Sequence, residues 1–272
     1  MNRSRARALT IAGSDSGGGA GIQADLKTFS VLGVYGLSAV TAVTVQNTQG
    51  VSASEALSPG IVGAQIRAVA DDIGVDAAKT GMLATAAIVE AVADALAEVE
   101  VPAIVVDPVF RSKHGHALLA ADAVDALRTR ILPLATLVTP NLPEAAGLAG
   151  FGVQTRDDMR RAAAAILADG ARAVLVKGGH MQDDPMVASD LFADGTTEEW
   201  ISAPRFDTPN THGTGCTLSA AITAHLARGD ALLDAVRAGK AFVTEAIRHA
   251  LPLGHGIGPV DALWPVPPEG LV

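Results

Sequence analysis

Apolar residues along this chain fall into two alternating patterns. Short apolar runs, typical of buried strands, alternate with stretches in which apolar residues recur every three or four positions, as on one face of a helix. Strands are predicted at residues 8–12, 37–45, 75–79, 103–107, 136–139 and 172–177. Helices are predicted at residues 22–32, 120–132, 214–227 and 231–250, and from residues 58, 85 and 155 onward.

This alternation predicts a mostly parallel sheet, because parallel strands are joined by crossover helices that cover both faces. One hairpin departs from it, where Val187–Phe192 and Glu199–Ala203 flank the turn residues Asp194-Gly195. No internal repeat or linker interrupts the pattern, so residues 1–272 are predicted to form a single domain, with residues 1–7 as a basic tail. The predicted fold class is α/β, in three layers: a mostly parallel central sheet, helices on both faces and an antiparallel edge hairpin.

Unusual polar residues follow nearly every predicted strand. They are Gly13-Ser14-Asp15, Gln46-Asn47, Lys79-Thr80-Gly81-Met82, Asp107-Pro108, Pro140-Asn141 and Lys177-Gly178-Gly179. Ligands of an open parallel sheet bind outside the carboxyl ends of its strands. A binding site is therefore predicted along this edge.

Charge and cysteine content narrow the class of partner. The net charge of −9 and the pI of about 5.2 disfavour nucleic acids and anionic membranes. No apolar run approaches the roughly 18 residues of a membrane-spanning helix, and the run after Arg3, Arg5 and Arg7 is too short for a signal peptide. Cys216 is the single cysteine, so no internal disulfide forms, and we expect the chain in the reducing cytoplasm.

Gly213-Thr214-Gly215 opens the helix predicted at residues 214–227 and forms a candidate anion site. Glycines there leave backbone N–H groups accessible, and the helix dipole favours negative charge at this end. Cys216 lies in the first helical turn, a position that lowers the pKa of a thiol and makes it a candidate proton acceptor. His212 is a second candidate base. A flexible helix entry and a small buried cysteine are the alternative interpretations.

Asn141 and Glu144 follow a predicted strand and stand one helical turn apart. Such a pair can order water around Mg²⁺, which takes few ligands from protein, or it can form an N-cap with its capping partner. Asp107 offers a second carboxylate at a strand end, or simply an Asp-Pro turn. Lys177 can reach a phosphate across the two glycines that follow it, or lie along the surface before a turn.

A dinucleotide-dependent oxidoreductase is the alternative from another class of enzyme. Gly19-Ala20-Gly21-Ile22-Gln23-Ala24 matches the G-x-G-x-x-A pattern after a first strand. That fold needs an acidic residue about 20 positions further on, to bind the ribose. No Asp or Glu occurs between Asp25 and Glu55, which disfavours this interpretation, and no P-loop motif is present either.

Several stretches together resemble the hydroxymethylpyrimidine kinases. The similarity is greatest in Gly18-Gly19-Ala20-Gly21-Ile22-Gln23-Ala24-Asp25 and in Thr139-Pro140-Asn141-Leu142-Pro143-Glu144-Ala145. It extends to residues 46–48, 79–83, 177–180, 210–221 and 254–260, and so covers nearly the whole chain in the expected order.

The resemblance implies a ribokinase-like fold that uses ATP and Mg²⁺. It implies transfer of the γ-phosphoryl group to the hydroxymethyl group of an aminopyrimidine. A second transfer then converts the monophosphate to the diphosphate used in thiamine biosynthesis. It also implies a homodimer.

The resemblance also assigns roles to the candidate residues. Gln46 resembles the amide that binds the pyrimidine, Met82 a wall of that pocket, and Asp25 either a third pocket residue or a helix-surface carboxylate. A glutamine amide does offer the donor and acceptor that complement an aminopyrimidine edge. The anion hole is assigned to Gly213, Thr214 and Gly215, the base to Cys216, and the metal and phosphate group to Asp107, Asn141, Glu144 and Lys177.

Three positions depart from, or qualify, the family pattern. Gly17 stands where the family usually has serine. The loop Phe110-Arg111-Ser112-Lys113-His114 differs from the sequence that the family usually has there. Many ribokinase-like enzymes carry aspartate at the position of Cys216, so the cysteine is typical of the pyrimidine and pyridoxal kinase branch. A pyridoxal-type vitamin kinase is therefore the nearest alternative function.

Overall fold

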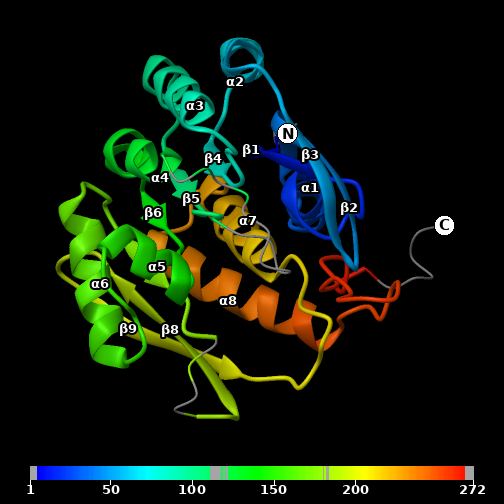
Figure 1. The fold of residues 1–272 in the computed structure, drawn as a ribbon, viewed down its shortest axis with the longest axis vertical. Coiled ribbons are helices and arrows are strands. Elements are labelled where there is room, and N and C mark those ends of the chain that lie inside the picture. The colour runs from blue at the N-terminus through cyan, green and yellow to red at the C-terminus, as the bar shows by residue number, and fades with distance from the viewer. Residues whose placement is uncertain are drawn as a thin grey trace.

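In the part of the chain that the structure describes, nine strands join in a single sheet of the order β3-β2-β1-β4-β5-β6-β7-β8-β9 (Figure 1). The structure is a computed structural model that describes residues 5–110, 118, 120, 122–179, 181 and 184–266. The six strands from β2 to β7 run parallel, and β3, β8 and β9 are antiparallel to their neighbours. The strands are β1 (Arg7–Asp15), β2 (Tyr35–Asn47), β3 (Gly50–Ala56), β4 (Ala77–Thr80), β5 (Ile104–Val106), β6 (Leu137–Val138), β7 (Val174–Val176), β8 (Val187–Ala193) and β9 (Glu198–Pro204).

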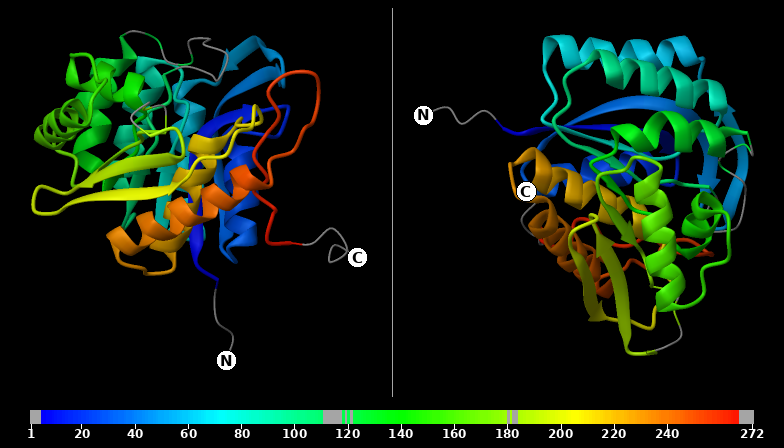
Figure 2. Two further views of the ribbon diagram at one scale, coloured as in Figure 1. Left: turned by 90° about the horizontal axis from the view of Figure 1, so that it is seen from below. Right: turned by 90° about the vertical axis from the view of Figure 1, so that its left-hand side faces the viewer.

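Helices cover both faces of the sheet, as the alternating pattern predicts (Figure 2). Helices α1 (Gly21–Val31), α7 (Thr214–Ala227) and α8 (Leu232–Arg248) cover one face. The other face carries α2 (Pro59–Asp72), α3 (Ala86–Glu98), α4 (Ala123–Ala126), α5 (Leu142–Ala149) and α6 (Arg156–Ala168). Successive residues of β5 divide between the two layers: Ile104 and Val106 pack with α2 and α3, whereas Val105 packs with α7 and α8. The three-layer α/β fold and the β8–β9 edge hairpin are thereby confirmed.

Local capping explains where several helices begin. The hydroxyl of Thr85 accepts a hydrogen bond from the Ile88 amide at the start of α3. Thr155 and Asp158 form a reciprocal capping box at the start of α6. Pro59 occupies the first turn of α2, where its missing N–H costs nothing.

The fold differs from the sequence prediction at three elements, one of which, α5, was considered only as a possible N-cap at Asn141. Strand β3 was not predicted, because most of its side chains are exposed and leave no apolar alternation to detect. The helix predicted at residues 120–132 is a single α-helical turn, α4, followed by a π-helical turn at Leu127–Ile131 and a 3-10 turn at Leu132–Leu134. Pro133 lies in that last turn and cannot donate the hydrogen bond that would extend an α-helix.

The basic tail is shorter than predicted. Arg7 is the first residue of β1, and its guanidinium binds the Asp76 carboxylate at 2.6 Å. Residues 1–4, the loop residues 111–114 and His180 of the family motif lie outside the described residues. Within the described part of the chain, no helix is both long and apolar enough to span a membrane.

Helix α2 offers a matched test of the core. Ile66 is fully buried against the sheet, whereas Ile61 on the same helix is 50% exposed. We expect Ile66→Ala to lower the free energy of unfolding by about 2–5 kcal/mol, because it removes buried methyl groups and leaves a cavity. Ile61→Ala should change it by less than about 0.5 kcal/mol. Urea unfolding of both variants measures the difference, and equal losses would contradict this packing.

Candidate active site

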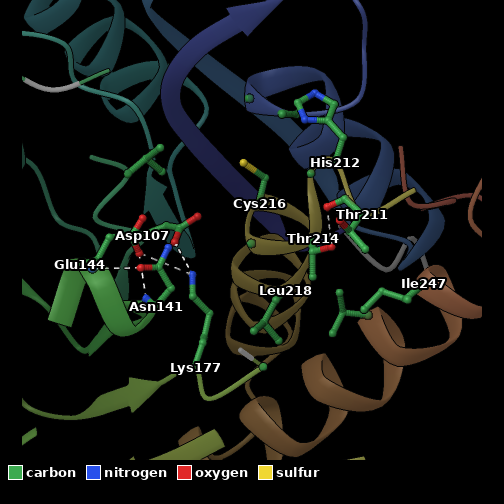
Figure 3. Close-up of a pocket in the computed structure, with 18 of the residues that line it drawn as sticks. Asp107, Asn141, Glu144, Lys177, Thr211, His212, Thr214, Cys216, Leu218 and Ile247 are labelled. Atoms are coloured by element: carbon green, nitrogen blue, oxygen red, sulfur yellow. Dashed lines mark hydrogen bonds and ion pairs between the residues drawn. The ribbon is translucent and has the colours of Figure 1, made fainter. Parts of the chain in front are cut away.

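A cavity of about 770 Å³ lies along the carboxyl edge of the parallel strands. Strand ends from β1 to β7 and the N-terminus of α7 line it, and Figure 3 shows one part of it. All the site residues predicted from the sequence line this cavity except Asp25. The loops after separate strands thus meet in one place, as expected for an open parallel sheet.

Asp107, Lys177 and Glu144 form a charged cluster on one side of the cavity (Figure 3). The Lys177 ammonium lies 3.0 Å from the Asp107 carboxylate and 4.0 Å from that of Glu144. Burial opposes the charge on Asp107, but Lys177 and Lys79 outweigh it and hold the pKa of Asp107 below its ordinary value. Burial raises the pKa of Glu144 to about 7, because Lys177 offsets it only in part and Asp107 adds to it. The cluster therefore has two buried carboxylates, on Asp107 and Glu144, and only one ammonium group, on Lys177, to balance them.

Asn141 and Glu144 form the capping box of α5 that the sequence allowed as an alternative. The Asn141 side chain accepts from the Glu144 amide, and Glu144 Oε2 accepts from the Asn141 amide at 2.8 Å. Both residues nevertheless line the cavity. The capping bonds hold the carboxylate of Glu144 beside Lys177, so the local and the functional interpretation are compatible.

These residues suit a magnesium ion that keeps most of its water. Asp107 and Glu144 present buried carboxylates, and Mg²⁺ prefers oxygen ligands and needs few from the protein. Among residues in the described ranges, no three His, Cys, Asp or Glu side chains form a closed metal cage. An ion here would thus be held through water and a ligand's own oxygens.

Helix α7 points its N-terminus at this cluster. A Cβ atom on Gly215 would stand 3.3 Å from the Lys177 ammonium and 3.6 Å from Asp107. Gly213 has a φ of +80°, and a Cβ there would stand 1.8 Å from the carbonyl oxygen of Gly19. Only glycine fits at 213, and the tight approach fixes the backbone N–H groups that open α7. An anion placed between these groups and Lys177 would be stabilised from both sides.

Cys216 lies in the first turn of α7, but its thiol does not have the lowered pKa that the sequence predicted. Burial raises the pKa of Cys216 to about 11. Lys79 and the Gly21 amide favour the thiolate, whereas Asp25 and Asp107 disfavour it. Desolvation therefore outweighs the helix position, and Cys216 is a thiol at neutral pH.

Asp25 does not face the cavity. Its side chain is fully buried behind Lys79, whose ammonium lies 2.9 Å from both carboxylate oxygens. Thr10 donates a third hydrogen bond to it at 2.6 Å. Burial alone would lower the pKa of Lys79, but the negative charges around it, that of Asp25 foremost, together outweigh burial and raise it, while burial raises the pKa of Asp25. Direct pyrimidine contact by Asp25 is thus corrected to an indirect role, in which it holds Lys79 at the cavity wall.

Sequence reasoning placed Lys79 and Asp15 at the predicted binding edge but assigned neither of them a role in the site. Lys79 ends a buried strand, and a lysine within an apolar run is the signal that would have identified it. Asp15 accepts backbone hydrogen bonds from Gly17, Gly19 and Ala20 and contacts His212 Nε2 at 2.9 Å. Burial raises its pKa, but these bonds outweigh that effect and hold the pKa below its ordinary value.

Gln46 closes the other end of the cavity. Its Nε2 lies 3.3 Å from His212 Nε2, and its Oε1 lies 3.0 Å from the Thr44 hydroxyl. Met82, also at the cavity wall, packs its sulfur near Gly13. An amide and a thioether thus flank the space where a flat polar ring would fit.

The remaining wall is largely apolar and was not predicted. Leu218 of α7 and Ile247 of α8 lie near one another there (Figure 3), and Val243 adds to this surface. Lys240 and Asp190 form a buried ion pair at 2.7 Å beside it. This wall suits a second planar group, so the cavity has room for two ligands end to end.

Comparison with known proteins agrees with this arrangement. A family model described as phosphomethylpyrimidine kinase matches residues 15–261. A hydroxymethylpyrimidine/phosphomethylpyrimidine kinase of Streptomyces coelicolor is 57% identical over 256 residues, which cover 94% of each chain.

Two solved structures share the fold over nearly its full extent. Bacillus subtilis pyridoxal kinase, solved as an ADP complex, superposes with a TM-score of 0.89 at 43% identity, covering 96% of this chain and 98% of that one. The phosphomethylpyrimidine kinase of Clostridium difficile superposes with a TM-score of 0.79 at 43% identity, covering 89% and 100%. With the family match spanning residues 15–261, this chain belongs to the phosphomethylpyrimidine kinase family and has the ribokinase-like fold of its phosphotransferases.

Proposed function

We propose that this chain transfers the γ-phosphoryl group of ATP to 4-amino-5-hydroxymethyl-2-methylpyrimidine and then to the resulting monophosphate. One observation carries the proposal. The amide of Gln46, the N-terminus of α7 and the apolar side chains of Leu218, Val243 and Ile247 all line one cavity. A pyrimidine, a transferring phosphate and an adenine would occupy these three parts in turn.

The chain's own residues supply positioning and charge. Backbone N–H groups at Gly213–Gly215 and the ammonium of Lys177 would hold the transferring phosphoryl group. The thiolate form of Cys216, a minor species at neutral pH because burial raises the pKa of the thiol, would take the proton of the hydroxymethyl group as its oxygen bonds to phosphorus and the bond to ADP breaks. Because an alcohol is a weaker acid than a thiol, this transfer accompanies or follows a loose transition state.

Magnesium completes the proposal. Asp107 and Glu144 would hold the ion through water, while Asn141 fixes Glu144 by the capping box. Mg²⁺, when bound, neutralises charge on the phosphate oxygens. We further propose a cytoplasmic location and a homodimer, in keeping with the family resemblance.

A pyridoxal-type kinase is the second candidate. The superposition with Bacillus subtilis pyridoxal kinase supports it, as does the apolar and thioether character of the ring site near Met82. Comparing the two substrates in one ADP-release assay decides between them, and we expect the aminopyrimidine to have the higher kcat/KM.

Gln46 should determine pyrimidine binding. Gln46→Leu leaves the polar edge of the ring without partners, so affinity should fall by about 1–3 kcal/mol. Isothermal titration measures this, with the exposed Gln154→Leu as a control for the general effect of losing an amide. Unchanged affinity in Gln46→Leu would assign ring recognition to another residue.

The dependence of activity on Mg²⁺ distinguishes the kinase interpretation from the oxidoreductase interpretation. Activity should disappear with EDTA and return with Mg²⁺, because the buried carboxylates of Asp107 and Glu144 then regain a cation. Mg·ATP should raise the melting temperature, and NAD should not. Protection by NAD alone would instead favour the dinucleotide interpretation.

Cys216 should act as the proton acceptor. A positioned base contributes about 10²–10⁴-fold, so Cys216→Ala should lower kcat by that factor and leave the KM for ATP nearly unchanged. Cys216→Asp should retain part of the activity. His212→Ala is measured in parallel. Near-normal turnover in Cys216→Ala beside an inactive His212→Ala would transfer the role to the histidine.

The raised pKa of Cys216 has its own readout, because this chain has no other cysteine. Only the thiolate is alkylated, so the rate of iodoacetamide labelling of the ligand-free enzyme should rise about tenfold per pH unit from neutral pH towards pH 11. A rate that already levels off near pH 8 would show a thiolate stabilised by the helix.

A further inference from the structure

Four side chains that line the cavity around Gln46 form a chain of contacts. His212 Nε2 lies 2.9 Å from Asp15 Oδ2 and 3.3 Å from Gln46 Nε2. On its other side Gln46 Oε1 lies 3.0 Å from the hydroxyl of Thr44, which is also 2.9 Å from the Ser14 carbonyl oxygen. Segments far apart in the sequence thus converge on a single amide group.

The protons in this chain can be assigned from geometry. The Asp15 carboxylate accepts from the Gly17 amide at 2.8 Å, and from the amides of Gly19 and Ala20 at 3.1 and 2.9 Å. Three backbone donors require an ionised carboxylate, so the contact with Asp15 requires a proton on His212 Nε2. This nitrogen is then a donor, whether the ring is neutral or charged.

A donor at His212 Nε2 conflicts with an N–H group of Gln46 at 3.3 Å. The Thr44 hydroxyl meets a second conflict, since its one proton cannot serve both the Ser14 carbonyl and Gln46 Oε1. A half-turn of the amide exchanges nitrogen and oxygen at nearly the same positions. The oxygen then accepts from His212, and the nitrogen donates to Thr44, which in turn donates to Ser14. The one proton on His212 Nε2 is then shared between Asp15 and the Gln46 oxygen, and no two donors face one another in this orientation.

We propose that His212, held by Asp15, is a positioning residue that fixes the Gln46 amide with its oxygen toward the imidazole, and that this orientation selects 4-amino over 4-oxo pyrimidines. The inference rests on the proposed function. An amino group beside a ring nitrogen presents a donor next to an acceptor, which this amide complements. A 4-oxo ring presents the reverse order and would need the opposite orientation, which His212 and Thr44 oppose.

The imidazole is held firmly enough for this role. A Cβ on Gly19 would stand 2.5 Å from His212 Cδ2, so the ring packs directly on the glycine backbone. The His212 amide donates to Gly258 at 3.0 Å, and its carbonyl accepts from Val260 at 3.0 Å. Two chain segments therefore fix the backbone of His212 while Asp15 fixes its ring.

The test measures specificity. In the wild type, kcat/KM should favour the 4-amino compound over 5-hydroxymethyl-2-methylpyrimidin-4-one by at least about 100-fold. In His212→Gln the new amide can donate or accept, and in Asp15→Asn the imidazole is free to exchange its proton. Each variant should reduce the ratio by about tenfold or more, mainly through a lower KM for the 4-oxo compound.

A second histidine–aspartate pair provides the matched control. His225, at the opposite end of α7 and outside the cavity lining, lies 2.6 Å from Asp230, and His225→Gln should keep the wild-type ratio. An unchanged ratio in folded His212→Gln and Asp15→Asn overturns the inference.

Nitrogen-15 NMR of the wild-type imidazole gives a readout independent of turnover and of variant folding. A proton on His212 Nε2 supports the network, and a neutral ring protonated only at Nδ1 overturns it. If the wild type phosphorylates neither pyrimidine, the proposed function fails, and the NMR result still decides the network.

Discussion

The site depends on one constraint: charged side chains that are buried away from water must be paired with side chains of opposite charge. Three lysine–aspartate pairs surround the cavity, and each joins a different pair of elements: Asp25 with Lys79, Asp107 with Lys177, and Asp190 with Lys240. Removing one member of such a pair leaves an uncompensated charge, which costs about 3–5 kcal/mol. The same pairs that hold the strand ends and helices together therefore also place three lysine side chains beside the ligand space.

The net charge of the chain does not describe the charge of the cavity. The chain carries a net charge of −9, but Lys79, Lys177 and Lys240 line the cavity beside the carboxylates of Asp107 and Asp190. Local placement of charge, and not the average over the chain, therefore determines where a phosphate-bearing ligand can bind.

Local sequence patterns predicted most helices and strands. The features of the site that these patterns did not predict depend mostly on contacts between residues far apart in the sequence. The start of α7 at Thr214 and the capping box at Asn141 follow from neighbouring residues, so the sequence was sufficient there. The contact of Asp15 with His212 spans 197 positions, and no periodicity connects them. Cys216 shows a further limit: helix position favours the thiolate, but burial, which the sequence does not reveal, decides the outcome.

The contact of Gly213 with the Gly19 carbonyl also shapes how the protein folds. The loop after β1 and the start of α7 must meet before the candidate anion site can form. Nearly two hundred residues of strands and helices separate these two segments along the chain. Closing such a long loop is entropically slow, and chains dominated by distant contacts fold slowly. A growing polypeptide on the ribosome would carry an unfinished active site until its last quarter emerges, so binding competence arises late and all at once.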